Sequence, residues 1–381
     1  MIPAPPPPPA LAHLTAALDE LESHGLRRVR PRPRLASDLS FCSNDYLGLA
    51  AAGIGGARAV APSGAGASRL VSGERQAHVD LERDLAAWLQ VPSALVFSSG
   101  YAANVGTIGA LARPGDLVVS DEYNHASIID GCRLSRARIV VIPHLDLGAM
   151  ERALRDARAS GGGRAGQTWV VTESYFSMDA DSPDLVALRT LASRFDAALV
   201  VDEAHALGVL GPDGRGLCAA VGVIPDVILG TFGKAFGHAG AFAAGCHELT
   251  DWLWNRARSF VFSTGMSPQV AEGARLALAF AVAHPELRER VRVAAHALRT
   301  GLRTLDANVL GYGHILPWVV GDALAATRLA DALQGAGVHV QAIRPPTVPA
   351  GAARLRMTVT AGHELADIER ALTALRQIVR G

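Results

Sequence analysis

The sequence predicts an α/β protein with a large domain, in which helices cover a mostly parallel central sheet, and a smaller C-terminal α/β domain. Short apolar runs rich in β-branched residues alternate with segments of helical periodicity, which is typical of a parallel sheet covered on both faces. The 381 residues exceed the roughly 250–300 at which a single core stops growing. The pattern also changes after Pro268, where a long helical stretch begins.

Four segments follow from this pattern. Residues 1–9 are rich in proline, which predicts a flexible or polyproline II tail, and residues 10–48 are expected to form an N-terminal helix and arm. The large domain is predicted over 49–265, with strands at 95–98, 117–120, 138–142, 169–172, 198–202, 227–230 and 241–244 and helices at 79–90, 102–112, 127–136 and 185–195. The small domain, 266–381, is predicted to continue as helix to about residue 305 and to form strands at 315–320, 338–343 and 355–359.

Composition and charge exclude several classes of function. The 36 Lys and Arg residues equal the 36 Asp and Glu residues, so no basic excess indicates nucleic acid or an anionic membrane. Four widely spaced cysteines without a CxxC pair disfavour disulfides and a metal site and indicate the reducing cytoplasm. The N-terminus does not have the pattern of a signal peptide, and the longest apolar stretch is too short to span a bilayer.

Lys234 is the only lysine among the 36 basic residues. Arginine can replace lysine in most surface roles, but its guanidinium stays protonated and offers no free amine for Schiff-base chemistry. Lys234 ends the sequence GTFGK, directly after a predicted strand, where glycines allow close approach of a ligand and apolar neighbours lower a lysine pKa. A surface lysine in a glycine loop is the alternative, and the position at a strand end favours a lysine that carries a cofactor.

Asp202 ends another predicted strand and begins the sequence DEAH, which closes with His205. The same letters occur in helicases, but nucleotide hydrolysis requires a GxxxxGK[ST] loop, and here alanine follows Lys234. An aspartate at a strand end suits the carboxylate that faces the pyridinium nitrogen of pyridoxal phosphate (PLP), and a helix N-cap is the alternative. Parallel sheets bind ligands at the carboxyl ends of their strands, where both Asp202 and Lys234 are predicted to lie.

Weaker signals come from other residues that follow predicted strands. Gly100 and Tyr101 open a helix, whose free N–H groups can bind phosphate, although an ordinary capped helix begins in the same way. Thr231 places a hydroxyl beside the lysine. His125 can stack on a pyridine ring or serve as a structural histidine. Ser177 can donate to a phenolate oxygen or merely begin a turn.

Together these residues appear in the chain order of the fold-type I PLP enzymes, and the sequence resembles the α-oxoamine synthases over almost its whole length. The matching segments are 43–49 (SNDYLGL), 64–73, 100–104, 124–127, 173–181, 201–205, 231–237 and 262–268. The run 342–360 is especially similar to the branch of the family that acts in biotin biosynthesis. The chain departs from the family where Ala206 and Leu207 follow His205 and where the glycine run is reduced at 64–68.

The resemblance implies PLP-dependent decarboxylative condensation of L-alanine with a pimeloyl thioester. Lys234 would carry PLP and then act as the base at the alanine Cα, and Asp202 would keep the ring nitrogen protonated. His125 would stack on the ring, and Ser177 and His205 would hydrogen-bond the phenolate oxygen. The implied cofactor-binding residues within one chain are Gly100, Tyr101, His125, Ser177, Asp202, His205, Thr231 and Lys234.

The resemblance also implies substrate contacts and partners. Arg356 matches the family arginine that grips the amino-acid carboxylate, and the other implied substrate contacts are Arg27, Asn44, His125 and Thr347. Family members are homodimers with the site at the interface, so Ser263 and Thr264 would reach the neighbour's phosphate. The sequence leaves open whether coenzyme A or acyl carrier protein brings the acyl chain.

Two rival functions follow from the same residues. A sister enzyme, such as glycine C-acetyltransferase, 5-aminolevulinate synthase or a long-chain acyl condensing enzyme, would use the same chemistry on other substrates. A PLP-fold binding protein without turnover is the more distant rival, and intact Lys234 and Asp202 argue against it.

Overall fold

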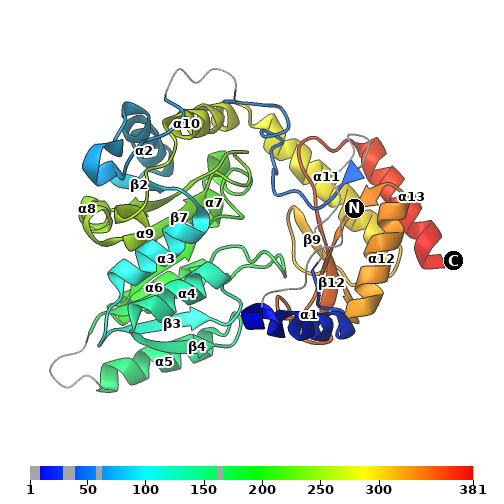
Figure 1. Ribbon diagram of the computed structural model, residues 1–381, viewed down its shortest axis with the longest axis horizontal. Coiled ribbons are helices and arrows are strands. Elements are labelled where there is room, and N and C mark those ends of the chain that lie inside the picture. The colour runs from blue at the N-terminus through cyan, green and yellow to red at the C-terminus, as the bar shows by residue number, and fades with distance from the viewer. Residues whose placement is uncertain (1–8, 29–38, 57–61, 161–165, 381) are drawn as a thin grey trace.

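The computed structural model describes residues 9–28, 39–56, 62–160 and 166–380. Two lobes stand side by side in Figure 1, with the central sheet and its helices on the left and the remainder of the small domain on the right, whereas the segment 268–283 lies beside 76–89 on the left. Most of the predicted proline-rich tail lies outside the described residues. The boundary at residue 266, proposed from the sequence, stays a proposal.

A seven-stranded sheet forms the centre of the large domain. Its strands lie in the order β2 (Ser93–Phe97), β8 (Ala241–Gly245), β7 (Val227–Thr231), β6 (Ala198–Asp202), β5 (Thr168–Glu173), β3 (Leu117–Asp121) and β4 (Arg138–Ile142). All neighbours pair in parallel except β8, which runs antiparallel to both β2 and β7. The predicted fold class, an α/β fold with a mostly parallel sheet, is confirmed.

Helices cover both faces of this sheet because both faces are apolar. Side chains of α3 (Gly100–Leu111), α4 (Ala126–Ser135), α8 (His247–Arg256) and α9 (Arg258–Val261) pack on one face. Side chains of α5 (Leu147–Ser160), α6 (Leu185–Arg194) and α7 (Gly216–Ala220), which follows the short 3₁₀ turn η3 (Pro212–Gly214), pack on the other. A third cluster joins α2 (Gln76–Leu89) to α10 (Pro268–Ala283) at the edge beside β2. Strands buried on both faces read as continuous apolar runs, which is why their sequence was recognisable.

The small domain differs from prediction at two points. The expected long helix is two helices, α10 and α11 (Glu286–Arg303), because Pro285 lacks the N–H that would continue the first. The expected strand 338–343 is split into β10 (Val338–His339) and β11 (Gln341–Ile343). The two strands pair with different partners: β10 pairs with β1 (Leu39–Ser40), whereas β11 pairs with β12 (Ala353–Thr358).

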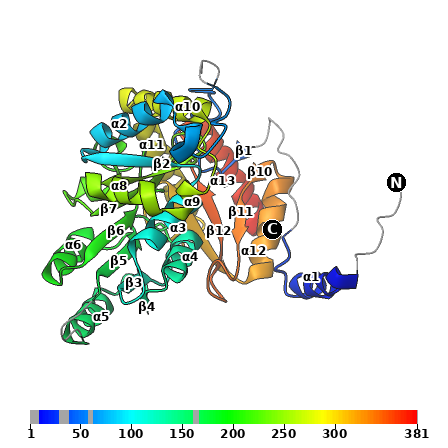
Figure 2. The same ribbon diagram turned by 60° about the vertical axis from the view of Figure 1, so that its left-hand side comes forward.

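The remaining elements complete the small domain around a three-stranded antiparallel sheet of β11, β12 and β9 (Ile315–Gly321). Two helices, α12 (Ala323–Gly335) and α13 (Leu365–Arg380), pack with it. The N-terminal 3₁₀ turn η1 (Pro9–Leu11) and α1 (His13–Ser23) lie beside α12 (Figures 1 and 2). No residue of α1 is buried. Among the described residues, no helix is long and apolar enough to cross a membrane.

Candidate active site

A cavity of about 230 Å³ lies at the carboxyl ends of the central strands, where the sequence predicted a site. The ends of β5, β6 and β7 and the start of α3 contribute to its wall. Its lining residues are Asn44, Gly100, Tyr101, Asn104, His125, Ser127, Glu173, Asp202, Ala204, His205, Gly230, Thr231, Gly233 and Lys234. The structure therefore brings most of the predicted site residues together, and adds Asn104, Ser127 and Glu173, to which no role was assigned from the sequence.

Lys234 lies in the turn after β7, on the cavity wall. Burial lowers the pKa of its amine to about 8, and the nearby Asp202 and Glu173 carboxylates oppose this shift. An amine with this pKa is partly unprotonated near neutral pH. Lys234 is thus poised to act as a nucleophile or a base in the cavity.

Asp202 is held at the end of β6 by two hydrogen bonds. Its Oδ1 accepts from the backbone N–H of Ala204 at 2.8 Å, as a cap would, and its Oδ2 accepts from Asn104 Nδ2 at 2.7 Å. Asn104 also donates to Ser127 Oγ at 2.8 Å. A turn and not a helix follows Asp202, so the helix N-cap alternative is wrong: one oxygen closes the turn while the carboxylate lines the cavity.

Glu173, at the end of β5, is a second buried carboxylate beside Asp202. Burial and the neighbouring Asp202 charge raise its pKa to about 8, although Lys234 acts in the opposite direction. Glu173 accepts a hydrogen bond from the backbone N–H of His125 at 2.7 Å, and the ring Nδ1 of His125 lies 2.7 Å from Ser127 Oγ. These contacts set the position of His125 at the cavity, and burial lowers the pKa of its imidazole.

A hydrogen-bonded group connects the large domain to Arg356 of β12. His205 Nδ1 lies 2.7 Å from the hydroxyl of Tyr46, which lies 3.0 Å from Asn44 Oδ1. Arg356 donates to Asn44 Oδ1 at 3.2 Å and to the backbone oxygen of Ser177 at 2.6 Å. Burial and the positive charges of Lys234 and Arg356 keep the pKa of His205 well below its ordinary value, so this imidazole is neutral at physiological pH.

The start of α3 has the geometry expected of the predicted anion site. Ser99 caps the helix by accepting from Ala102 N at 3.1 Å, and the first N–H groups of a helix have no acceptor within it. Thr231 lies across from Gly100: a Cβ placed on that glycine would stand 3.7 Å from the threonine hydroxyl. The Thr231 hydroxyl accepts from Gly233 N at 3.0 Å and donates to Gly240 O at 2.9 Å. Tyr101 lines the same end, and its hydroxyl donates to Asp130.

Six predicted site residues do not line this cavity in the single chain, and one of them is Arg356, whose contacts are given above. Ser177 meets Arg356 through its backbone oxygen. Arg27 pairs with Glu22 at 2.5 Å, and the exposed Thr347 accepts from Arg28 at 3.3 Å. Ser263 and Thr264 lie in the turn between α9 and α10, outside the cavity that contains Lys234.

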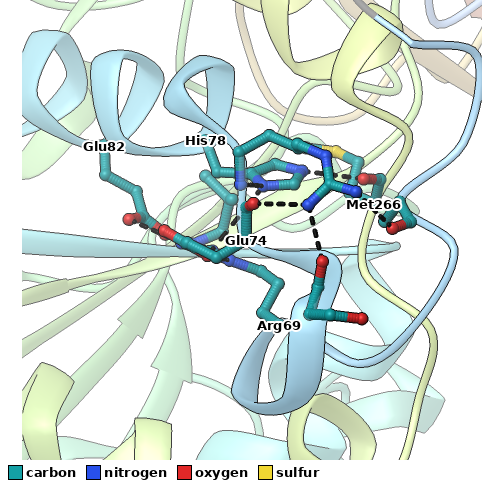
Figure 3. Close-up of polar contacts among 9 residues, drawn as sticks. Arg69, Glu74, His78, Glu82 and Met266 are labelled. Carbon is teal, nitrogen blue, oxygen red and sulfur yellow. Dashed lines mark hydrogen bonds and ion pairs between the residues drawn. The ribbon is translucent and has the colours of Figure 1, made fainter.

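That turn is braced by a buried ion cluster around Arg69 (Figure 3). Arg69, in the π-helical turn η2 (Arg69–Gly73), donates to Glu74 at 2.5 Å and to Glu82 at 2.6 Å. His78 Nε2 lies 2.7 Å from the backbone oxygen of Met266. Because Arg69 is only 4% exposed and both carboxylates compensate its charge, the cluster holds the chain before α2 against the turn at 263–266.

His144 forms a second ion cluster, next to the loop that carries Ser177. Its Nδ1 lies 2.9 Å from Asp121 and its Nε2 lies 3.1 Å from Asp181, and its ring stacks on Tyr123. Burial alone would lower its pKa, but the two carboxylates outweigh burial and raise the pKa to about 10. The imidazolium therefore ties the end of β3 to the loop at 177–181.

We expect the His144→Gln substitution to lower the free energy of unfolding by about 2 kcal/mol near pH 6, because it removes two charge-assisted hydrogen bonds. The folded-state pKa lies above the ordinary value of 6.5, so the stabilisation is complete below pH 6.5 and is lost as the pH rises through about 10. Equilibrium denaturation of both proteins across this range measures the difference. His284→Gln, at an exposed histidine with one partner, is the control. An equal difference at pH 6 and above pH 10 would contradict the charged cluster.

The cavity contains one lysine, a carboxylate at a strand end and a helix N-terminus. This combination is typical of a PLP-dependent enzyme. The chain belongs to the aminotransferase class I and II family, whose model matches residues 36–375. Within this family it groups with the 8-amino-7-oxononanoate synthases. The relative from Geobacter sulfurreducens is 46% identical, covering 89% of this chain and 88% of its own, and that from Aromatoleum aromaticum is 42% identical, covering 97% and 98%.

Solved structures agree with this assignment. A serine palmitoyltransferase variant from S. paucimobilis with bound PLP superposes with a TM-score of 0.88 at 27% identity, covering 97% of this chain and 98% of its own. The 8-amino-7-oxononanoate synthase of Francisella tularensis superposes with a TM-score of 0.73 at 25% identity, covering 90% and 98%. The resemblance to α-oxoamine synthases, the fold-type I architecture and PLP as the cofactor are thereby confirmed.

The residues of this cavity fit PLP. The lysine amine has a lowered pKa, the Asp202 carboxylate lines the same cavity, and the helix N-terminus offers N–H donors for a phosphate. Sequence reasoning missed Asn104 and Glu173. Asn104 carried a readable signal, since it is an amide on an otherwise apolar helix, one turn after Gly100. Glu173 carried none beyond its place at a strand end.

Proposed function

We propose that the protein condenses L-alanine with a pimeloyl thioester to give 8-amino-7-oxononanoate, CO2 and the free thiol carrier, as a step of biotin biosynthesis. The observation that carries this proposal is identity of 42–46% to 8-amino-7-oxononanoate synthases over nearly the whole chain. The cavity described above supports it, because Lys234, Asp202, His125 and His205 line it together. The acyl carrier, coenzyme A or acyl carrier protein, is left to experiment.

The cofactor-binding residues have different roles in the proposed reaction. When bound, PLP supplies an electron sink that stabilises negative charge at the amino-acid Cα. Lys234 holds the cofactor and then, as a free amine, takes the proton from Cα. Asp202 keeps a proton on the ring nitrogen, and Asn104 holds the Asp202 carboxylate in place at 2.7 Å. The lowered pKa of Lys234, about 8, supports the role of base near neutral pH.

Two histidines and the phosphate site orient the cofactor. His125, in the place that Glu173 and Ser127 give it, would hold the cofactor by contact with its ring. His205 donates to the phenolate oxygen, and Ser177 belongs to this contact only if its hydroxyl turns toward the cavity. Gly100, Tyr101 and Thr231 hold the phosphate end.

Substrate recognition is assigned to Arg356 and Asn44. Arg356 reaches the site from the small domain, and two of its nitrogens already lie against Asn44 and Ser177, which aim the guanidinium. A guanidinium in this place binds a carboxylate through two parallel hydrogen bonds and sets which bond of Cα stands perpendicular to the cofactor ring. Arg27 and Thr347 are assigned to the acyl substrate, and the Arg28–Thr347 contact of 3.3 Å supports their proximity.

We also propose a homodimer in the cytoplasm, in which Ser263 and Thr264 contact the partner's phosphate site. Leu11, Leu14, Leu18 and Leu21 form an exposed apolar stripe around α1, each 43–46% exposed, which suits burial by a second copy. Phe262, next to Ser263, is 73% exposed. Sedimentation of the purified protein tests this assembly.

A long-chain acyl condensing enzyme is the second candidate, favoured by the structural similarity to serine palmitoyltransferase. Sequence identity separates the two candidates: it is 27% to that enzyme and 46% to the synthase of Geobacter sulfurreducens. The first candidate is therefore preferred.

The decisive experiment offers purified holoenzyme alanine, glycine and serine, each with acetyl, succinyl, pimeloyl and palmitoyl thioesters. We expect the alanine–pimeloyl pair to give the highest kcat/KM. Glycine should be about 10–200-fold poorer but not inert, because one methyl group in an apolar pocket discriminates by only about 1–3 kcal/mol. If palmitoyl or acetyl thioesters outcompete pimeloyl thioester, the biotin assignment is wrong, while the condensing chemistry survives.

A further inference from the structure

Tyr46 stands between the two polar groups that the reaction depends on, His205 and Arg356. We propose that Tyr46 is a positioning residue: its hydroxyl donates to Nδ1 of His205 and so fixes the tautomer in which Nε2 carries the proton and presents an N–H to the cavity. This inference rests on the proposed function, in which the atom facing His205 is the phenolate oxygen of the cofactor.

The surroundings of Tyr46 leave its ring little freedom. The residue is fully buried, and its ring meets the edge of His314 at 4.2 Å between centroids. His314 is itself 1% exposed and lies against Tyr175 at 5.3 Å. With the ring held in this way, the hydroxyl keeps a constant place at 2.7 Å from His205 Nδ1.

The protons of this group can be counted. Burial raises the pKa of Tyr46, so its hydroxyl keeps its single proton, and His205 is neutral and carries one N–H. The Tyr46 proton has two possible acceptors, His205 Nδ1 at 2.7 Å and Asn44 Oδ1 at 3.0 Å. In the part of the chain that the structure describes, Nε2 of His205 makes no hydrogen bond, so it is the nitrogen left for the cavity.

Arg356 resolves the competition for the Tyr46 proton. It donates to Asn44 Oδ1 at 3.2 Å and lies 3.5 Å from the Tyr46 oxygen, so Asn44 has a donor without Tyr46. With Tyr46 donating to the nearer His205 Nδ1, Asn44 Oδ1 keeps Arg356 as its donor and the free N–H of His205 is Nε2. In the opposite arrangement Nε2 offers a lone pair, which would face the lone pairs of a phenolate oxygen and repel it.

The consequence is a chain of donors from the small domain to the cavity: Arg356 to Tyr46, Tyr46 to His205, and His205 to the cofactor oxygen. Tyr46 touches neither the cavity nor a substrate in this geometry, since it is absent from the cavity lining. Its effect on the reaction is therefore exerted through His205.

The first test measures the His205 tautomer directly. Nitrogen-15 labelling of the 13 histidines distinguishes protonated from unprotonated ring nitrogens by chemical shift, and the spectrum of His205→Gln assigns the His205 signals. In the wild-type holoenzyme we expect the proton on Nε2. In Tyr46→Phe we expect a mixture of tautomers, because the phenyl ring cannot donate to Nδ1. A proton on Nδ1 in the wild-type protein would overturn the proposal.

The second test uses binding and kinetics. Tyr46→Phe should weaken PLP binding by the apoenzyme about tenfold. This is the effect expected when His205 no longer donates a hydrogen bond to the charged phenolate oxygen. The kcat should fall about tenfold as well, whereas KM for alanine should change less than threefold, because Arg356 keeps its contacts with Asn44 and Ser177. A rise in KM with unchanged kcat would overturn the proposal by placing Tyr46 in carboxylate binding.

Tyr175→Phe is the matched control. Tyr175 is equally buried, contacts the same His314, and donates its hydroxyl at 2.5 Å to the backbone oxygen of Tyr312, not to His205. It should leave the His205 tautomer and the PLP affinity unchanged, and a shift equal to that of Tyr46→Phe would overturn the proposal. If Tyr46→Phe fails to fold, the wild-type tautomer still decides. The tautomer is measured without substrate. A failure of the proposed reaction in the substrate screen can therefore be distinguished from a failure of the proposed positioning role of Tyr46.

Discussion

Lys234→Arg should abolish turnover while leaving the fold intact. The substitution keeps a positive charge at the end of β7, but a guanidinium with a pKa above about 12 has no free amine to hold the cofactor or to take a proton. We expect kcat to fall by at least about 10⁴-fold, since both covalent and base catalysis are lost. Steady-state and single-turnover assays measure the loss, and circular dichroism checks the fold.

Two further measurements connect this loss to the amine itself. Reduction of the wild-type holoenzyme with borohydride should fix the cofactor on a single peptide, the one containing Lys234, because this is the only lysine in the chain. A Lys234→Ala variant should recover part of its activity in the presence of a small primary amine, whereas Lys234→Arg should not. Normal turnover by Lys234→Arg would show that another group performs the chemistry.

Asp202→Asn should retain the cofactor but lose most of its ability to remove the alanine Cα proton. An amide cannot keep a proton on the ring nitrogen, so the electron sink is weakened, and we expect Cα–H exchange with deuterated solvent to slow by about 10²–10³-fold. The pKa of Lys234 should also fall below about 8, because Asp202 is one of the charges that raise it. NMR of alanine in deuterated buffer measures the exchange.

Asp226→Asn serves as the control for this substitution. Asp226 also accepts from a backbone N–H, that of Leu199 at 2.7 Å, but it lies outside the cavity of Lys234. Exchange at the wild-type rate in Asp202→Asn would mean that Asp202 serves only the turn that its 2.8 Å contact with Ala204 closes.

The central strands were predictable because of their burial. The strand at 198–202 agrees residue for residue with β6, because a buried strand is a continuous apolar run. The strand at 138–142 agrees with β4, a partly exposed strand at the edge of the sheet, because its residues are β-branched. Burial also concealed the direction of β8: an antiparallel strand covered on both faces has the same apolar pattern as a parallel one. Residues 338–343 also read as one strand, but their partners change at Val340, from β1 to β12.

The candidate site was predictable where a single residue type carries the chemistry. A sole lysine, an aspartate at a strand end and a glycine at a helix start are visible in the sequence, and their order along the chain indicated the family. Sequence reasoning chose Asp202 over Glu203, its neighbour in DEAH, because Asp202 ends the predicted strand. In the structure Glu203 turns away to accept from Ser174 at 2.5 Å and from Cys218 N at 2.7 Å, since neighbouring residues of a strand point to opposite faces.

What the sequence determined by itself is the order of most strands and helices and a candidate for the nucleophile, because local periodicity and the chemistry of one amine are properties of short segments. Only the tertiary structure decided which groups meet. Tyr46 and His205 are 159 residues apart, and Arg356 and Asn44 are 312 apart, yet each pair lies within hydrogen-bonding distance. Such contacts depend on how the small domain packs on the sheet, and packing is a property of the whole chain.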